Sequence, residues 1–175
     1  MTVVTKFEAA TRHLNAVIRL LFEGEDSLVV HSLAASAANV FSDLVETRDS
    51  HKSWRWLIRE DHGLSSAGIR DVLHRSWNFF KHAERDPNET LDFNANETEY
   101  LIFHATVECG EYGVTSIEMQ LFQLWFLASG RLQLVEADDL HLAGEQLFPG
   151  LAGMPREQQF REGAKALRMQ VEDLR

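Results

Sequence analysis

The sequence predicts an all-α protein, an antiparallel bundle of four main helices with additional short helices. Apolar residues recur every three or four positions along several stretches of the chain, the spacing that places them on one face of a helix. No stretch alternates apolar and polar residues in the way that half-buried strands do. Because most connections between these stretches are short, successive helices are expected to pack as antiparallel neighbours.

The first two helices are the most clearly marked. Residues 6–23 carry an apolar stripe opposite a polar face, and Gly24 is expected to end this helix. Residues 27–45 continue the apolar pattern, and the side chains of Asp26 and Ser27 are available to cap the free backbone N–H groups. These two stretches therefore predict a pair of helices joined by a tight turn.

A longer connection follows, and a third amphipathic helix comes after it. Residues 47–66 are mostly polar but contain Trp54 and Trp56. Large aromatic side chains in a loop usually fold back over the edge of a core, so this stretch is expected to be such a loop. Residues 69–86 separate their polar and apolar side chains onto two faces, which predicts one long helix. Pro87 disfavours helical conformation in the residue before it, so the helix should end there.

The second half of the chain predicts four more helices. Thr115 stands three residues before Glu118, the spacing of a capping box, and Asn96 stands at the same spacing before Glu99. Residues 117–129 are apolar nearly all round, which is typical of a helix at the centre of a bundle or of one that meets a partner subunit. The other predicted elements are an extended segment at 91–95, helices at 97–109 and 136–147, and a final helix after the break at 150–155.

The predicted domain organisation is one bundle over residues 1–150, followed by a C-terminal helix within residues 151–175. A chain of 175 residues is long enough to bury one real core and short for two. The last helix carries a single narrow apolar stripe, typical of a helix that docks on its own bundle or on another chain. This terminal stripe consists of Phe160, Ala164, Leu167, Val171 and Leu174.

Composition excludes several classes of function. The net charge of −10 opposes broad binding to nucleic acid or to anionic membranes, which depends on clustered Lys and Arg. No apolar run approaches the roughly 20 residues of a membrane span, and the N-terminus lacks the features of a signal peptide, so a cytoplasmic protein without membrane association is expected. Cys109 is the only cysteine, which excludes an intramolecular disulfide. No base is evident beside it, so a catalytic thiol is not expected.

The best functional signal lies on the polar face of the predicted helix at 69–86. Arg75 and His82 are seven residues apart, two helical turns, and therefore project in nearly the same direction. A guanidinium can hold a phosphate with two hydrogen bonds and an imidazole can transfer a proton near neutral pH, so this pair, with Asn78 between them, predicts phosphodiester cleavage without a metal. The alternative is a solvated helix face. The residues expected to contact neighbouring phosphates are His74, Lys81 and Arg85. His31 of the second helix is either a hydrogen-bonded core residue or, if it faces His82 across the bundle, part of the same cleft.

Two stretches carry a family resemblance, RLLFEGEDSLVVHSLAASAANVFSDLV at residues 19–45 and RSWNFFKH at residues 75–82. They resemble the HEPN group of small helical-bundle proteins. The resemblance implies a ribonuclease site that is assembled where two such helices meet across a homodimer. Arg75 would hold the phosphate, and His82 would move a proton as the ribose 2′-hydroxyl attacks. It also implies a second outcome, an inactive relative that binds RNA or a nucleotide. The stretch NFFKHAERDP at 78–87 is also similar to small bacterial proteins.

Two other classes of function stay open. A metal site is suggested by three carboxylate and histidine pairs at helical spacing, Asp71 with His74, Asp138 with His141, and His104 with Glu108. Paired-metal bundles need two Glu-x-x-His segments and two further glutamates, a pattern that the sequence lacks, so neither a metal nor a cofactor is expected. The other class is a non-catalytic interaction module for a protein partner, whose partner or dimer surfaces would be the helix at 117–127 and the terminal stripe.

Overall fold

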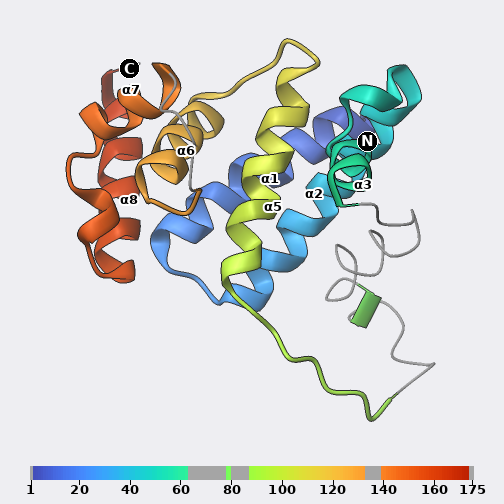
Figure 1. The fold of residues 1–175 in the computed structure, drawn as a ribbon, viewed down its shortest axis with the longest axis horizontal. Coiled ribbons are helices and arrows are strands. Elements are labelled where there is room, and N and C mark those ends of the chain that lie inside the picture. Colours follow the sequence, from blue (N-terminus) through green and yellow to red (C-terminus); the bar gives the residue numbers. More distant parts are fainter. Residues whose placement is uncertain (1, 63–77, 80–86, 133–138, 174–175) are drawn as a thin grey trace.

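The computed structural model describes residues 2–62, 78–79, 87–132 and 139–173. Within these ranges every regular element is a helix, which confirms the predicted all-α class (Figure 1). The described elements are α1 (Lys6–Glu23), α2 (Ser27–Arg48), the 3-10 helix η1 (Ser50–Lys52), α3 (Trp54–His62), α5 (Asn96–Gly110), α6 (Ile117–Ala128), α7 (Asp139–Leu147), the 3-10 helix η2 (Leu151–Gly153) and α8 (Arg156–Asp173).

Four helices, α1, α2, α5 and α6, share one apolar core. The pairs α1 with α2 and α5 with α6 are antiparallel, because a short turn joins the two members of each pair. The helices α2 and α5 run parallel, since His31 lies beside Thr98 near their starts and Ser42 lies beside Glu108 further along. The chain between α2 and α5 must therefore return from one end of this pair to the other.

The predicted ends of the first two helices are confirmed, with one extension. Gly24 has a φ of 75°, in the left-handed region that glycine adopts without steric cost, and it ends α1. The side chain of Asp26 accepts hydrogen bonds from two backbone N–H groups in the first turn of α2. The helix α2 continues to Arg48 instead of ending at Val45, which makes Arg48 part of its last turn.

The predicted capping box at the start of α6 is wrong. Ser116 caps the helix, and its Oγ accepts a hydrogen bond from the Met119 backbone N–H at 3.2 Å. Glu118 does not reach back to Thr115, because its carboxylate instead pairs with the Arg19 guanidinium of α1 at 2.5 Å. A tertiary ion pair therefore replaces the local interaction that the spacing predicted.

The predicted cap at the start of α5 is also wrong. Asn96 lies inside the helix, which has no side-chain cap, and its own backbone N–H donates to the Asn94 side chain at 3.1 Å. Glu99, the expected partner of Asn96, is buried and forms an ion pair with Arg156 of α8. The acidic residue that seemed to serve a local turn instead joins two distant helices.

The stretch 47–66, predicted to be a loop, contains η1 and α3. Trp54 lies at the start of α3 with its ring edge-on to the His104 ring, 4.9 Å between centroids. Trp56 contacts the ring of His51 in η1 at 4.6 Å. The prediction of a loop is therefore wrong over residues 50–62, although Trp54 does pack against the bundle.

The apolar helix α6 packs against α1, α5, α7 and α8 and so has an interior position in the bundle, one of the two positions that its sequence predicted. Trp125 has no exposed surface, stacks on Phe160 of α8 at 5.8 Å, and donates its ring N–H to the Gln159 carbonyl oxygen at 2.8 Å. The helix therefore buries its apolar surface within its own chain. Its other buried residues are Met119, Leu121, Phe122, Phe126, Leu127 and Ala128.

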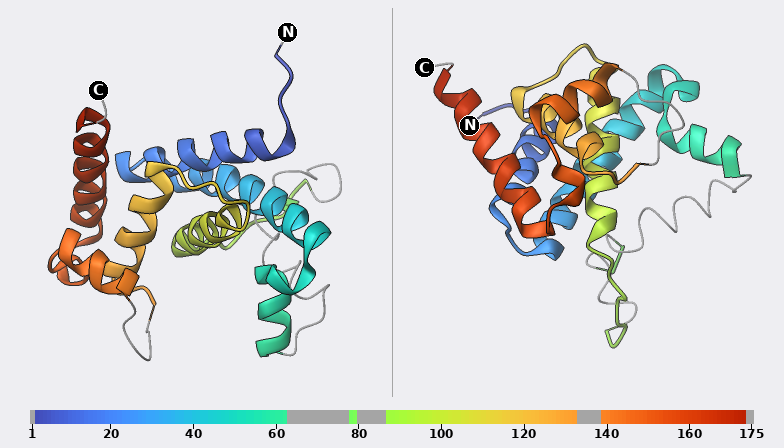
Figure 2. Two further views of the ribbon diagram at one scale, coloured as in Figure 1. Left: turned by 90° about the horizontal axis from the view of Figure 1, so that it is seen from above. Right: turned by 60° about the vertical axis from the view of Figure 1, so that its left-hand side comes forward.

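Glycines allow the last two helices to approach this core closely. A Cβ on Gly144 of α7 would lie 2.6 Å from the Leu124 carbonyl oxygen of α6. A Cβ on Gly163 of α8 would lie 2.5 Å from the ring of Phe22 of α1. The helices α7 and α8 consequently cover one end of the bundle, while α3 lies at the opposite end (Figures 1 and 2).

Contrary to the expectation from the sequence, one of the described helices, α2, has the length and mean hydropathy of a membrane-spanning segment. It packs against α1 and α5, and the central helix of a bundle commonly has this composition. The composition of α2 therefore decides nothing about where in the cell the protein acts.

Candidate functional site

Most of the site predicted from the sequence lies outside the described residues. The residues outside are His74, Arg75, Lys81, His82 and Arg85. Asn78 is described, and it is exposed to solvent. The convergence of Arg75 and His82 stays a prediction.

His31 is a buried residue of the bundle, with 2% of its surface exposed. Its Nδ1 lies 3.0 Å from the Thr98 hydroxyl of α5, and its ring meets the Phe93 ring edge-on at 5.1 Å. Burial lowers the pKa of His31 to about 4, so the imidazole is neutral at neutral pH. The other nitrogen, Nε2, has no hydrogen-bond partner among the described residues. His31 therefore packs between the first turns of α2 and α5.

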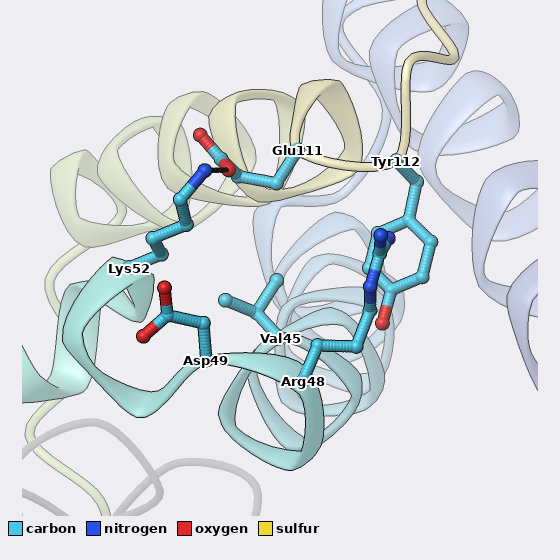
Figure 3. Close-up of a pocket in the computed structure, with 6 residues that line it drawn as sticks. All are labelled: Val45, Arg48, Asp49, Lys52, Glu111 and Tyr112. Atoms are coloured by element: carbon cyan, nitrogen blue, oxygen red, sulfur yellow. Dashed lines mark hydrogen bonds and ion pairs between the residues drawn. The ribbon is translucent and has the colours of Figure 1, made fainter.

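A pocket of about 230 Å³ lies where the last turn of α2 meets the end of α5 (Figure 3). Figure 3 shows the charged side chains around it, with the Lys52 and Glu111 pair opposite the stacked Arg48 and Tyr112. Its lining residues are Val45, Arg48, Asp49, Lys52, Glu111 and Tyr112.

The Arg48 guanidinium is held against an aromatic ring. Its Cζ lies 4.6 Å from the centroid of the Tyr112 ring, a cation–π contact. The Tyr112 hydroxyl donates to the Leu44 carbonyl oxygen at 2.7 Å, and the Phe7 ring lies 5.0 Å away, so the tyrosine is fixed in place. No carboxylate of the described residues lies within ion-pair distance of Arg48, which leaves its N–H groups available to a ligand.

The other charges of the pocket are partly compensated. Lys52 Nζ donates to Glu111 Oε2 at 2.7 Å, and this hydrogen bond raises the pKa of Lys52. Asp49 Oδ1 accepts from the His51 backbone N–H at 3.2 Å. The pocket therefore combines one unpaired guanidinium with carboxylate oxygens that can accept further hydrogen bonds.

A second polar centre is closed to solvent and joins α3 to α2 and α5. Glu108 of α5 is 1% exposed and accepts hydrogen bonds from the Ser42 hydroxyl at 2.6 Å and from the Trp54 backbone N–H at 3.1 Å. The Ser53 hydroxyl donates to Glu46 Oε1 of α2 at 3.1 Å and lies 3.5 Å from the Glu108 carboxylate, and Ser53 also caps α3 by accepting from the Arg55 backbone N–H at 3.2 Å. Glu108 thus fixes the first turn of α3 on the bundle.

His104, one turn before Glu108, has both of its ring nitrogens buried. Its Nε2 lies 3.5 Å from Glu108 Oε1, and neither nitrogen has a hydrogen-bond partner among the described residues. Burial, followed by the charge of Arg55, lowers the pKa of His104 to about 3. Burial raises the pKa of Glu108 to about 7, against the hydrogen bonds from Ser42 and Trp54 and the charge of Arg55, which lower it.

Of the three pairs that suggested a metal site, the described residues contain both members of only one, His104 and Glu108. His104 and Glu108 do come together, and His141 lies 3.4 Å from Glu145. Within the described ranges no group of three or more His, Cys, Asp or Glu side chains could hold a metal ion. The members that lie outside the described residues are Asp71, His74 and Asp138.

Sequence reasoning missed the pocket, because no spacing in the chain links its members. Arg48 belongs to α2, Lys52 to η1, and Tyr112 follows α5. The one available signal was a cation in the last turn of α2, which the helix dipole alone would also favour.

Comparison with known proteins adds no relative. No family model, no curated protein and no solved structure matches this chain.

Proposed function

We propose that this protein is a HEPN-like bundle that binds RNA or a nucleotide, and that Arg75 and His82 make it a metal-independent endoribonuclease. In this proposal His82 moves the proton of the ribose 2′-hydroxyl, and Arg75 holds the phosphate oxygens as negative charge develops. Two copies of the chain would form one cleft, so the active species is a homodimer.

The observation that supports the binding half of the proposal is the unpaired guanidinium of Arg48 on the Tyr112 ring. A guanidinium held over an aromatic ring presents its N–H groups to a phosphate, and its other face can stack on a base. Because the tyrosine holds the side chain in place, less conformational entropy is lost when a ligand binds.

The carboxylates of the pocket favour a nucleotide over a bare anion. Asp49 and Glu111 repel inorganic phosphate, whereas they can accept hydrogen bonds from ribose hydroxyls or from base amino groups. The volume of about 230 Å³ is below the roughly 300 Å³ of pockets that enclose larger ligands, so one nucleotide unit is the expected occupant.

The α2 and η1 residues of the pocket precede the proposed catalytic pair in chain order. Lys52 ends η1, and the chain from there to α5 contains Arg75 and His82 in its sequence. An RNA strand bound at Arg48 would lie at the start of the connection that carries the proposed catalytic pair.

The catalytic half is tested by RNA cleavage in the presence of EDTA. The variants His82→Ala and Arg75→Ala should each cleave a single-stranded RNA at least about 100-fold more slowly than wild type, the usual effect of losing an acid–base or phosphate-binding group. His13→Ala is the matched control, since His13 is exposed on α1. Wild-type protein that cleaves no RNA, or His82→Ala protein that cleaves normally, would end the catalytic proposal.

The binding half is tested separately by fluorescence anisotropy with a short labelled RNA. Arg48→Ala should weaken binding by about tenfold or more, as expected for a lost bidentate contact. Arg12→Ala, an exposed change on α1, should leave the affinity unchanged. Equal affinities for wild type and Arg48→Ala would remove the pocket from the proposal.

Light scattering tests the dimer. A protein that stays monomeric at assay concentration and still cleaves RNA would contradict a cleft built from two copies.

A non-catalytic interaction module is the weaker alternative, because the surfaces predicted to bind a partner, on α6 and α8, pack against other helices of the same chain. Phe122, Trp125 and Phe126 of α6 have no exposed surface. On α8, Phe160 stacks on Trp125 and Leu167 is buried, so this helix packs on its own bundle. A partner protein would have to use other surfaces.

A further inference from the structure

We propose that Glu108 and His104 act as a proton-exchanging pair, in which the proton carried by the imidazole in the unfolded chain is carried by the carboxyl group in the folded one. The attachment of α3 to the bundle then stays insensitive to pH over the mildly acidic range. This inference is independent of the proposed ribonuclease activity.

The geometry supplies a closed site for one proton. Glu108 Oε1 and His104 Nε2 are 3.5 Å apart, and both side chains are buried, 1% and 4% exposed. Trp54 of α3 covers the imidazole from one side. Neither His104 nitrogen has a hydrogen-bond partner among the described residues, and Glu108 Oε1, 3.5 Å from Nε2, belongs to a carboxyl group that can donate to it when protonated.

Taken alone, the titration of Glu108 lowers the free energy of unfolding as the pH rises. Its pKa is about 7 in the folded protein against an ordinary value of 4.5, so between these pH values the folded chain binds more protons. Its stabilising contribution is therefore fully present below about pH 4.5 and is lost as the pH rises through about 7.

Taken alone, His104 has the opposite effect. Its pKa is about 3 in the folded protein against an ordinary value of 6.5, so the unfolded chain binds more protons. Its contribution is lost as the pH falls from 6.5 through about 3.

The two effects cancel where they overlap. Between about pH 4.5 and 6.5 the unfolded chain carries one proton on His104, and the folded chain carries one on Glu108. Folding in this pH range takes up or releases no net proton. Because the proton moves from the imidazole to the carboxylate, both side chains are buried in their neutral forms. The other charged groups that face the pair are Arg55 of α3 and Glu46 of α2, which lie 3.5 Å from each other.

The test compares urea unfolding of wild type, His104→Phe and Glu108→Gln at several pH values. When the pH is lowered from about 8 to about 5, the folding equilibrium constant of His104→Phe should rise at least about tenfold relative to that of wild type. The reason is that this variant lacks the imidazole whose protonation favours the unfolded chain at acidic pH. Glu108→Gln, which has the shape of the protonated acid, should lose at least about tenfold over the same interval. The proposal would be overturned if the folding equilibrium constants of both variants changed in the same direction with pH, or if that of either variant did not change.

Infrared spectroscopy detects the protonated carboxyl group directly. A protonated carboxylic acid has a carbonyl band that a carboxylate lacks, and the folded wild type should show one such band at about pH 6, below the Glu108 pKa of about 7, that is absent from Glu108→Gln. Its absence from the wild type would place the proton elsewhere and refute the proposal, whatever the urea profiles show.

Discussion

Two buried glutamates on the same helix are stabilised in different ways, although both are close to fully buried. Near the start of α5, Glu99 pairs with the guanidinium groups of Arg156 and Arg131. Near its end, Glu108 has no guanidinium partner among the described residues, and the described groups that contact it are two serine hydroxyls, one backbone N–H and a neutral imidazole.

The difference shows two solutions to the cost of burying a carboxylate. The first keeps both charges and joins them, and the Arg156 guanidinium also lies 4.0 Å from the Phe160 ring centroid and 4.9 Å from that of Trp125. Burial lowers the pKa of Arg156 to about 10, so it is still charged at neutral pH. The second solution lowers the cost by protonation of the acid. The end of the bundle covered by α8 should therefore depend on charge pairing, and the end covered by α3 on the hydroxyl and N–H donors to Glu108 and on the proton that Glu108 carries beside His104.

The largest effect is expected from Glu99→Gln. It leaves Arg156 partly buried without a counter-charge, and removal of one partner from a buried pair costs about 3–5 kcal/mol of the free energy of unfolding. Urea denaturation measures this loss. Glu97→Gln, an exposed neighbour on α5, should stay within about 0.5 kcal/mol of wild type. A small effect of Glu99→Gln would show that the ion pair contributes little and would remove the contrast between the two sites.

Ser42→Ala should have a smaller effect that depends on pH. It removes the donor that lies 2.6 Å from Glu108, at a cost of about 1–3 kcal/mol when the carboxylate is ionised. Because the pKa of Glu108 is about 7, the loss should be larger at alkaline pH than at acidic pH. Urea denaturation across the pH range measures it, with Ser32→Ala on the exposed side of α2 as the control. A loss that is the same at every pH would contradict protonation of Glu108.

Ser53→Ala should act locally on α3. Loss of the N-cap side chain costs about 1 kcal/mol, and the backbone N–H of Arg55 loses its acceptor. Hydrogen exchange should accelerate in α3 while the amides of α8 stay protected. Equal acceleration at both ends would indicate that the two ends of the bundle unfold together.

The smallest effect is expected from Arg131→Ala. Its Nε lies 3.5 Å from Glu99, and Arg156 still neutralises that carboxylate when Arg131 is removed, so the loss should be no more than about 1 kcal/mol of the free energy of unfolding. A loss as large as that of Glu99→Gln would mean that Arg131, and not Arg156, is the main partner of this glutamate.

The sequence was sufficient for features that depend on neighbours along the chain. The apolar spacing in α1 and α2, the glycine after α1 and the cap at Asp26 are short-range effects, and each was predicted. The interior position of α6 was one of two options left by its apolar composition. The spacing of Arg75 and His82 is also a feature of neighbours along the chain, and the role of these two residues stays a prediction from spacing and family resemblance.

Only the tertiary structure decided which distant groups meet. Glu118 and Glu99 stood at capping-box spacing, but partners on α1 and α8 bind them more strongly than a local N–H group would. The parallel course of α2 and α5, the contact of Arg48 with Tyr112 and the burial of Glu108 beside His104 depend likewise on residues far apart in sequence. Local spacing reports the face on which a side chain lies, whereas the partner across the core is chosen by packing and by the need to satisfy buried polar groups.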